Sequence, residues 1–298
     1  MAYPRMKQHY MPVFYLKGFT DPSIRIPKKS YLWEFRFDRG TWEKSRPRGI
    51  AWASNFYAWL DRDGTQHNYV DEALKKVETW VAPTIRRLIS GRDSELNEVD
   101  VVNIATFVST MVGRAPGPIE ALVDFIEGTE STRLKLVCER LKGNPAELER
   151  AILRANVSRA EITADTLNPE RYRVNVNRAA VAASTLQTAS RFYPVFLEKS
   201  WLFLQSAAPD YFVVSDNPFF LNTETMEATI PFSRTLCLVL SHTRCPERGR
   251  KTIRFRKAAS ADEVESINAR TSERAAYFIA APTLDFPGAA FLKGKAPR

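Results

Sequence analysis

Three polar side chains border apolar stretches of the chain, and each is of a type that serves acid–base or phosphate chemistry. His9 precedes the apolar run 11–19, Arg114 follows the apolar segment 101–112, and Asp216 follows the apolar run 211–214. A buried polar group without a partner costs about 1–3 kcal/mol. We therefore predict that these three side chains converge and pair with one another.

A nuclease site would give these residues distinct roles. His9 would be the general acid or base, because the pKa of an imidazole lies near neutrality. Arg114 would hold the scissile phosphate and stabilise charge on its oxygens. Asp216 would orient His9 or hold one divalent ion, Mg²⁺ or Mn²⁺, and Asn217 would donate to the substrate. Tyr10, next to His9, is a further candidate for binding substrate.

Each of these residues also has a structural explanation, which stays open. The His9 ring can satisfy a backbone carbonyl inside the core. Arg114, as a cation at a helix C-terminus, is favourable with the helix dipole. Asp216 can hold its own backbone in a turn before Pro218.

Other ionisable residues narrow the chemistry. Glu72 and Glu78 are six residues apart and do not share a helical face, so we expect no paired-carboxylate site there. For Glu78, which lies between Val77 and Val81, a functional role is favoured slightly over a solvated one. The chain contains no GxxxxGK[ST], GxGxxG, GxSxG or HExxH motif, and it has only three histidines. P-loop ATPases, Rossmann dehydrogenases, α/β-hydrolases and zincins are therefore disfavoured, and no metal ligand set is assigned.

The charge of the chain favours a polyanionic partner. It carries 43 Lys and Arg against 34 Asp and Glu, a formal net charge of +9. Basic residues gather in segment 1–50 and again in segment 244–257, where Arg254 and Arg256 are candidates for contacting substrate. Two basic segments on one surface would bind nucleic acid or another polyanion by neutralising phosphates. A solvated basic surface that favours solubility is the alternative.

The elements that must position these residues fall into three regions. Region 1–69 alternates like strands and contains two predicted hairpins, one turning at residues 38–40 and one at residues 63–64. Region 70–196 is predicted to be helical, with helices at 70–89, from Ser94 to Arg114, at 118–127, 130–142, 145–155 and 176–196. Region 200–281 is predicted to hold strands at 201–206, 211–216, 228–232, 235–241, 251–257 and 276–281, with one helix at 262–275.

These regions predict a single α+β domain spanning residues 1–298. Its central mixed or antiparallel sheet would be built from both chain ends and packed against the helical middle, which would bring the two basic segments near each other. No apolar run approaches the length of about 20 residues that crosses a bilayer, and the first ten residues contain no signal-peptide core. Three cysteines without ligand spacing fit reduced thiols. We therefore expect a cytoplasmic protein with no membrane partner.

Several of these landmarks resemble DUF4238, a bacterial family of unknown function. Residues 9–19 read HYMPVFYLKGF, which matches the family pattern HYxPxxYLxxF. The Asp-Asn-Pro turn at 216–218, Trp201, the junction 114–116 and the pair 267–268 are similar to its later landmarks, although residue 115 is Ala where Thr is expected. The resemblance implies no activity. It does imply that His9, Arg114, Asp216 and Asn217 share a site.

Three classes of function follow from these observations. A nucleic-acid-directed enzyme, most simply a nuclease, is the first. A binding module for a nucleotide or nucleic acid, without catalysis, is the second. A structural or interaction subunit, in which the same motifs are folding features, is the third. An enzyme would place His9 and Asp216 in hydrogen-bond reach in an open cleft, whereas a structural protein would bury them apart on backbone partners.

Overall fold

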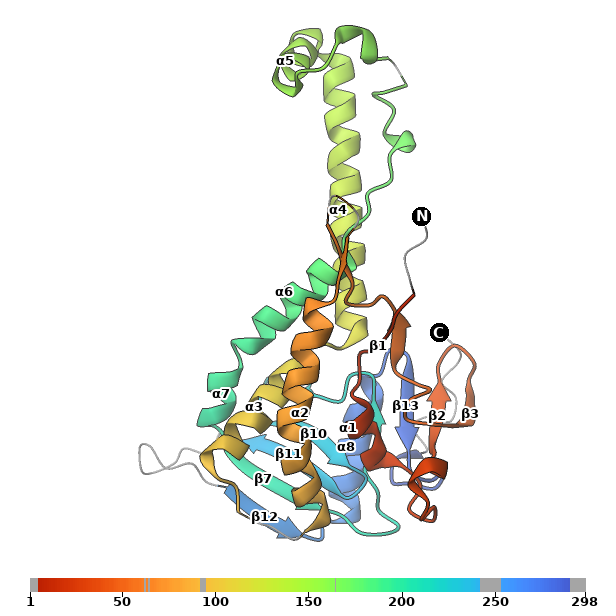
Figure 1. Ribbon diagram of the computed structural model, residues 1–298, viewed down its shortest axis with the longest axis vertical. Helices are drawn as coiled ribbons and strands as arrows, with labels where there is room; N and C mark the ends of the chain where they lie inside the picture. The colour runs from red at the N-terminus through yellow and green to blue at the C-terminus, as the bar shows by residue number, and fades with distance from the viewer. Residues whose placement is uncertain are drawn as a thin grey trace.

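A computed structural model describes residues 5–61, 63, 65–91, 95–163, 165–241 and 253–289 (Figure 1). It confirms the predicted α+β class, with a helical middle region and sheets that draw on both ends of the chain. The helices are α1 Val13–Leu16, α2 Tyr69–Ser90, α3 Glu98–Gly113, α4 Pro116–Gly143, α5 Pro145–Ala155, α6 Arg178–Ser190, α7 Tyr193–Glu198 and α8 Ala261–Glu273. Short 3₁₀ helices are η1 Lys17–Phe19, η2 Pro27–Lys29, η3 Arg159–Glu161 and η4 Pro169–Arg171.

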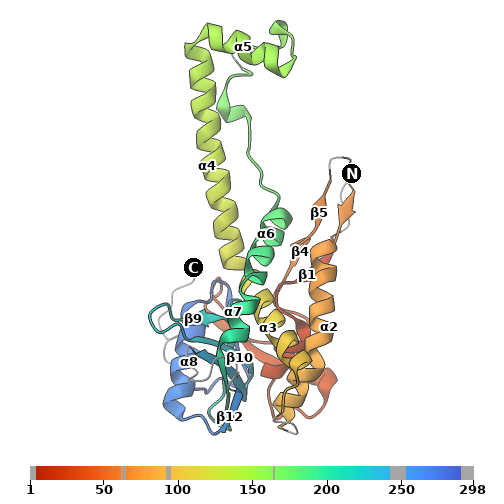
Figure 2. The same ribbon diagram turned by 90° about the vertical axis from the view of Figure 1, so that its left-hand side faces the viewer.

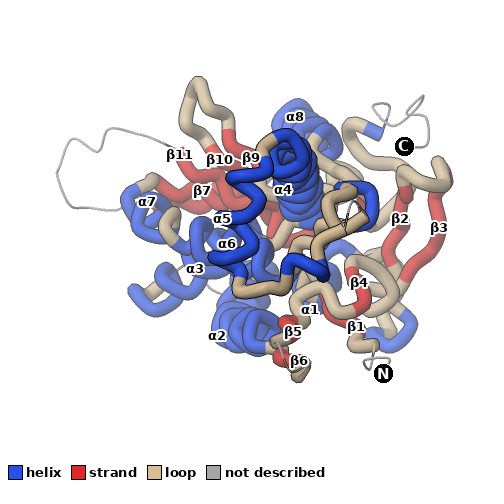
Figure 3. The backbone as a smooth tube through the Cα atoms, turned by 90° about the horizontal axis from the view of Figure 1, so that it is seen from above, coloured by secondary structure: helices blue, strands red, loops and turns tan. Residues whose placement is uncertain are grey.

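A five-stranded mixed sheet forms the centre of the body. Its order is β12-β7-β11-β10-β9, with β12 parallel to β7 and the other pairs antiparallel. Helix α8 lies on one side of this sheet, and α2 and α3 lie on the other (Figures 2 and 3). Because both faces are covered, the apolar run that starts at Trp201 needs no polar alternation. The strands are β7 Ser200–Gln205, β9 Phe220–Leu221, β10 Ala228–Ser233, β11 Leu236–Ser241 and β12 Ile253–Lys257.

A second, four-stranded sheet joins the two ends of the chain. Its antiparallel order is β3-β2-β13-β8, from β2 Leu32–Arg36, β3 Thr41–Ser45, β8 Val214–Ser215 and β13 Phe278–Ala281. Strand β8 is shorter than the predicted 211–216. The predicted hairpin at 38–40 is confirmed, and Gly40 adopts φ 66°, a conformation that glycine takes without strain. The N-terminal strands and β10–β12 thus belong to different sheets. The Arg234 N–H, in the turn between β10 and β11, donates to the Gly18 carbonyl of η1 at 2.9 Å and so ties the N-terminal segment to the five-stranded sheet.

Two small ribbons complete the strands. Strand β1 Lys7–His9 pairs with β4 Trp52–Ser54, and β5 Trp59–Leu60 pairs with β6 Gln66–His67. The second ribbon confirms the second predicted hairpin, although Gly64 of its turn lies outside the described residues. The first ribbon fixes His9 beside the segment that follows β3.

Helices α2 and α3 follow the predicted periodicity. Helix α2 ends at Gly91, whose φ of 64° is typical of a left-handed C-cap. Helix α3 begins later than predicted, because Asn97 caps it and accepts from the Asp100 N–H in a capping box. Ser94, the predicted start, lies outside the described residues.

The prediction of separate helices at 118–127 and 130–142 is wrong. Pro116 occupies the first turn of α4, where its missing N–H costs nothing, and the helix then runs unbroken to Gly143. Its 28 residues span about 42 Å. Helices α4 and α5 project from the body as an arm (Figures 1 and 2).

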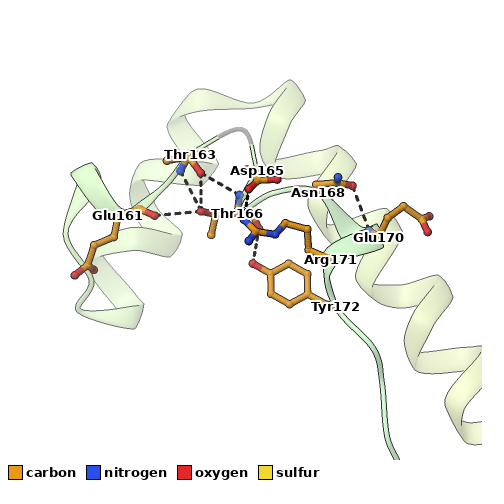
Figure 4. Close-up of polar contacts among 8 residues, drawn as sticks. All are labelled: Glu161, Thr163, Asp165, Thr166, Asn168, Glu170, Arg171 and Tyr172. Atoms are coloured by element: carbon orange, nitrogen blue, oxygen red, sulfur yellow. Dashed lines mark hydrogen bonds and ion pairs between the residues drawn. The ribbon is translucent and has the colours of Figure 1, made fainter.

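The chain returns from the arm tip through a segment that is held by its own polar contacts (Figure 4). The Tyr172 hydroxyl donates to the Thr166 carbonyl at 2.7 Å, and Arg171 forms an ion pair with Asp165. These contacts are local in sequence, so this segment is ordered by turns and not by a core.

The predicted helix 176–196 is broken into α6 and α7. Pro194 cannot donate the backbone hydrogen bond to the carbonyl four residues earlier, so a continuous helix would lose that bond. Helix α6 packs against α3, and α7 leads into β7. Within the ranges that the structure describes, no helix combines the length and the apolar character needed to span a bilayer.

Candidate functional site

His9 lies at the end of β1, where it pairs in register with Trp52 of β4. Its ring Nε2 is 3.4 Å from the backbone carbonyl oxygen of Arg48. Partial burial is the main cause that lowers the pKa of the ring below its usual value. The lowered pKa favours the neutral form of the ring, which lies at the border of the segment that follows β3.

Arg114 is 1% exposed at the junction of α3 and α4. Its Nη1 forms an ion pair with Glu78 Oε1 of α2 at 2.9 Å, and its Nη2 donates to the His9 carbonyl at 2.8 Å. Arg114 and His9 are thus brought together, but through the main chain of His9 and not through its ring. Glu78, for which a functional role was favoured slightly over a solvated one, supplies the carboxylate that was expected from Asp216.

Asp216 is completely buried and takes backbone partners. Its Oδ1 accepts from the N–H groups of Ala276, Tyr277 and Phe278 at 3.1, 2.9 and 3.1 Å. Burial raises the pKa of this carboxyl. The predicted mutual pairing of His9, Arg114 and Asp216 is therefore wrong, because backbone amides between α8 and β13 already satisfy the carboxylate.

The surroundings of Asp216 also do not suit a divalent cation. The donors to its carboxylate are N–H groups, whose positive ends repel a cation. Over the described parts of the chain, no group of three or more His, Cys, Asp or Glu side chains is arranged to hold a metal ion. Asn217 is 9% exposed and its backbone N–H donates to Ser215 Oγ at 3.2 Å. The Ser-Asp-Asn-Pro turn therefore has a structural role, in which Asp216 connects the end of β8 to the start of β13.

The remaining predicted contact residues are dispersed. Tyr10 is 9% exposed, and its ring contacts Phe56 at a centroid distance of 5.7 Å. Arg254 is exposed on β12, at the edge of the five-stranded sheet. Arg256 belongs to the same strand and pairs in register with Leu204. Residues 244–252 of the second basic segment lie outside the described residues.

A basic cavity of about 670 Å³ lies between η1, η2 and the segment after β3. Five cationic residues line it, and within the described part of the chain none of the five forms an ion pair with a carboxylate. Crowded cations without counterions raise the local positive potential and favour an anionic ligand. The five are Lys17, Arg25, Lys28, Arg46 and Arg48.

A second cavity of about 340 Å³ is lined by the next stretch of the same segment, from Gly49 to Ala53. Tyr10, Glu34 of β2 and Trp52 of β4 line it, together with the first turns of α4. Sequence reasoning named Tyr10 but missed Glu34. The available signal was the alternation of β2, because Glu34 shares a strand face with Leu32, which is fully buried.

Comparison with protein families finds a match to the model described as "Protein of unknown function (DUF4238)", over residues 7–283. No curated protein and no solved structure matches the chain. The match covers almost the whole described body and arm, and it includes the stretch HYMPVFYLKGF. The chain therefore belongs to the DUF4238 family.

Proposed function

We propose that this protein binds nucleic acid through the basic cavity. The observation that carries this proposal is the set of five cations, Lys17, Arg25, Lys28, Arg46 and Arg48, that line one concave surface without described carboxylate partners. Elsewhere on the surface, exposed cations such as Arg36 and Arg39 have acidic neighbours, at 2.7 and 3.0 Å. A phosphate backbone would supply the missing negative charge and release its counterions.

Aromatic side chains next to this cavity favour a single-stranded ligand. Lys44 Nζ lies 4.8 Å from the ring centroid of Tyr31 and 5.0 Å from that of Trp33. Tyr31 follows Ser30, which lines the cavity. Unpaired bases stack on such rings, whereas bases in a duplex are already stacked on one another.

Fluorescence anisotropy with labelled RNA, single-stranded DNA and duplex DNA across a series of KCl concentrations tests the proposal. The variant Arg46→Gln/Arg48→Gln is expected to bind at least tenfold more weakly at 100 mM salt. Loss of two phosphate contacts should also make the slope of log K against log salt about 1.4 less steep for a single strand. The variant Lys76→Gln/Lys142→Gln removes the same charge from exposed helical positions and serves as control. Equal losses in the two variants would contradict a localised site.

Phosphodiester cleavage is a second candidate, favoured by the position of His9. Its ring Nε2 lies 3.4 Å from the backbone carbonyl oxygen of Arg48, and Arg48 lines the basic cavity. Because its lowered pKa favours the neutral form, the imidazole can accept a proton. For cleavage, the cations of the basic cavity would hold the phosphate. Arg114 and Asp216 are buried and already bonded to Glu78, to the His9 carbonyl and to backbone N–H groups.

Incubation with the same three labelled nucleic acids, with and without Mg²⁺ and Mn²⁺, tests cleavage. The wild-type protein is expected to cut at least one of them. His9→Ala is expected to bind as the wild type does but to leave the strand intact. Cleavage that persists in His9→Ala would exclude His9 as the acid or base.

A further inference from the structure

The second cavity contains two polar groups that are almost buried yet have free hydrogen-bonding capacity. Glu34 is 4% exposed, and its Oε2 accepts from Ser45 Oγ at 2.7 Å, while no described residue donates to its Oε1. The Tyr10 hydroxyl is likewise without a hydrogen bond among the described residues. A buried polar group without a hydrogen-bond partner lowers the stability of the fold unless a ligand or a water molecule binds it.

Aromatic rings form much of the remaining wall. Trp52 is 40% exposed, and its ring is held from one side by Lys7 Nζ at 4.2 Å from its centroid. Phe56 and Phe278 line the same cavity. Arg36 and Glu120 also line the cavity, so its wall combines aromatic rings with polar groups. Such a wall fits a planar heteroaromatic ligand better than a flexible apolar one.

The two cavities share one stretch of chain. Arg46, Pro47 and Arg48 line the basic cavity, and the residues from Gly49 to Ala53 line the second. Consecutive Cα atoms are about 3.8 Å apart, so the two walls meet between Arg48 and Gly49. A strand whose phosphates occupy the basic cavity would therefore present a base next to the second one.

We propose that the second cavity holds one nucleobase with an exocyclic amino group, which donates to Glu34 Oε1 while the ring stacks on the aromatic wall. Adenine, cytosine and guanine carry such a group, and uracil does not. The proposal rests on the proposed nucleic-acid binding for its ligand class. It goes beyond that proposal in assigning base selectivity to a cavity that contains none of the five cations.

Binding of labelled eight-nucleotide RNA homopolymers of A, C and U tests this selectivity. The wild-type protein is expected to bind A and C at least tenfold more tightly than U. Glu34→Gln should reduce this ratio below twofold or reverse it. If Ser45 keeps donating to the oxygen of the new amide, the NH₂ group faces the cavity and replaces an acceptor with a donor.

Glu43→Gln is the matched control. Glu43 lies directly opposite Glu34 in the β2–β3 register, but it pairs with Arg39 and does not line the cavity. This variant makes the same change in charge and is expected to keep the preference for A and C. An equal loss of preference in Glu43→Gln would overturn the assignment to Glu34.

Saturation-transfer NMR with free adenosine, cytidine and uridine separates this inference from the proposed function. Adenosine and cytidine are expected to give signals that disappear in Glu34→Gln. If no oligonucleotide binds but these signals are seen, the proposed function fails and the base site stands. If oligonucleotides bind equally well and the nucleoside signals are absent or independent of Glu34, the base site is overturned and the proposed function stands.

Discussion

Buried charges in this protein connect segments that are far apart in sequence, and Arg114 is the clearest case. Its guanidinium bonds the Glu78 carboxylate of α2 and the carbonyl of His9 at the end of β1. One side chain thus fixes the helical region to the strand that precedes the family's apolar motif. Asp216 does the same between β8 and the start of β13.

Removal of the Arg114 side chain is expected to be strongly destabilising. Arg114→Ala leaves Glu78 without its cation and the His9 carbonyl without its donor, so the free energy of unfolding should fall by about 3–5 kcal/mol. Urea unfolding followed by circular dichroism measures this change. Arg133→Ala removes an exposed ion pair with Glu130 on the arm and should cost less than about 1 kcal/mol. Similar losses in both variants would show that the buried pair has no special role.

Glu34 is expected to make stability depend on pH. Burial is the main cause that raises its pKa in the folded protein, so the folded state holds this proton more tightly than the unfolded state does. Its contribution is therefore fully present below the unfolded pKa near 4.5 and is lost as pH rises through the higher folded pKa. Compared with wild type, Glu34→Gln should therefore be more stable at pH 7 than at pH 4: its free energy of unfolding minus that of wild type should increase with pH.

Urea unfolding at pH 4, 5.5 and 7 measures this difference. Glu265→Gln, on the exposed face of α8, reports the effect of removing one surface charge. If the free energy of unfolding of Glu34→Gln minus that of wild type stays constant or decreases from pH 4 to pH 7, a raised pKa of Glu34 is contradicted.

At this scale the sequence identifies which residues need partners but not which partners they take. His9, Arg114 and Asp216 border apolar stretches, and all three make polar contacts inside the fold. Two of the three use backbone groups as their main partners. Backbone amides and carbonyls are present at every position, so no residue type marks the ones that will meet a given side chain.

Among the elements, periodicity predicts those that face the core, and α4 shows where it fails. The predicted break between 127 and 130 falls at Gly128, where α4 continues without interruption. The outer part of α4 stands away from the body, with Phe125 and Leu136 exposed by 69% and 61%. A helix needs no continuous apolar stripe where it contacts only α5 and η4 and not the body, and one interior glycine costs only about 1 kcal/mol.

Two helical glycines are expected to respond in opposite directions to the same substitution. Gly128→Ala adds a methyl group where no atom lies within 4 Å, so it should stabilise the arm by up to about 1 kcal/mol. Gly113→Ala places a Cβ 2.8 Å from the Ala189 Cβ and 2.9 Å from the backbone of α6, and should cost about 1–3 kcal/mol. Amide hydrogen exchange in α4 and thermal unfolding of the whole protein measure the two effects. Stabilisation by Gly113→Ala would show that α3 and α6 are not closely packed.

For the whole molecule, the order of predicted strands and helices predicts the class but not the division into two sheets and an arm. The five-stranded sheet takes its strands from residues 200–257, whereas the four-stranded sheet joins strands from both chain ends. Strand pairing between distant segments depends on three-dimensional packing, which alternation within each strand does not encode. The charge excess of segment 1–50 does predict a basic surface, since all five cations of the basic cavity come from it.

The arm is expected to be dispensable for both the body and the basic cavity. The hydrogen bond from the Val176 N–H to Glu127 Oε1, at 3.0 Å, closes its base. Above that point Cys138, Leu148 and Ile152 are buried, but they belong to neither hydrophobic cluster of the body. Replacement of residues 130–173 by a six-residue Gly-Ser linker should therefore shift the thermal midpoint by less than about 4 °C.

The same deletion tests where the nucleic acid is held. The basic cavity and the cavity of Glu34 draw no residue from 130–173, so affinity for a single strand should stay within threefold of wild type. The arm tip has its own cavity of about 450 Å³, lined in part by Arg140, Arg150 and Arg154. If anisotropy instead shows a loss of affinity and a less steep salt dependence in the shortened protein, these arginines contact the phosphates, and the binding surface extends from the body to the arm.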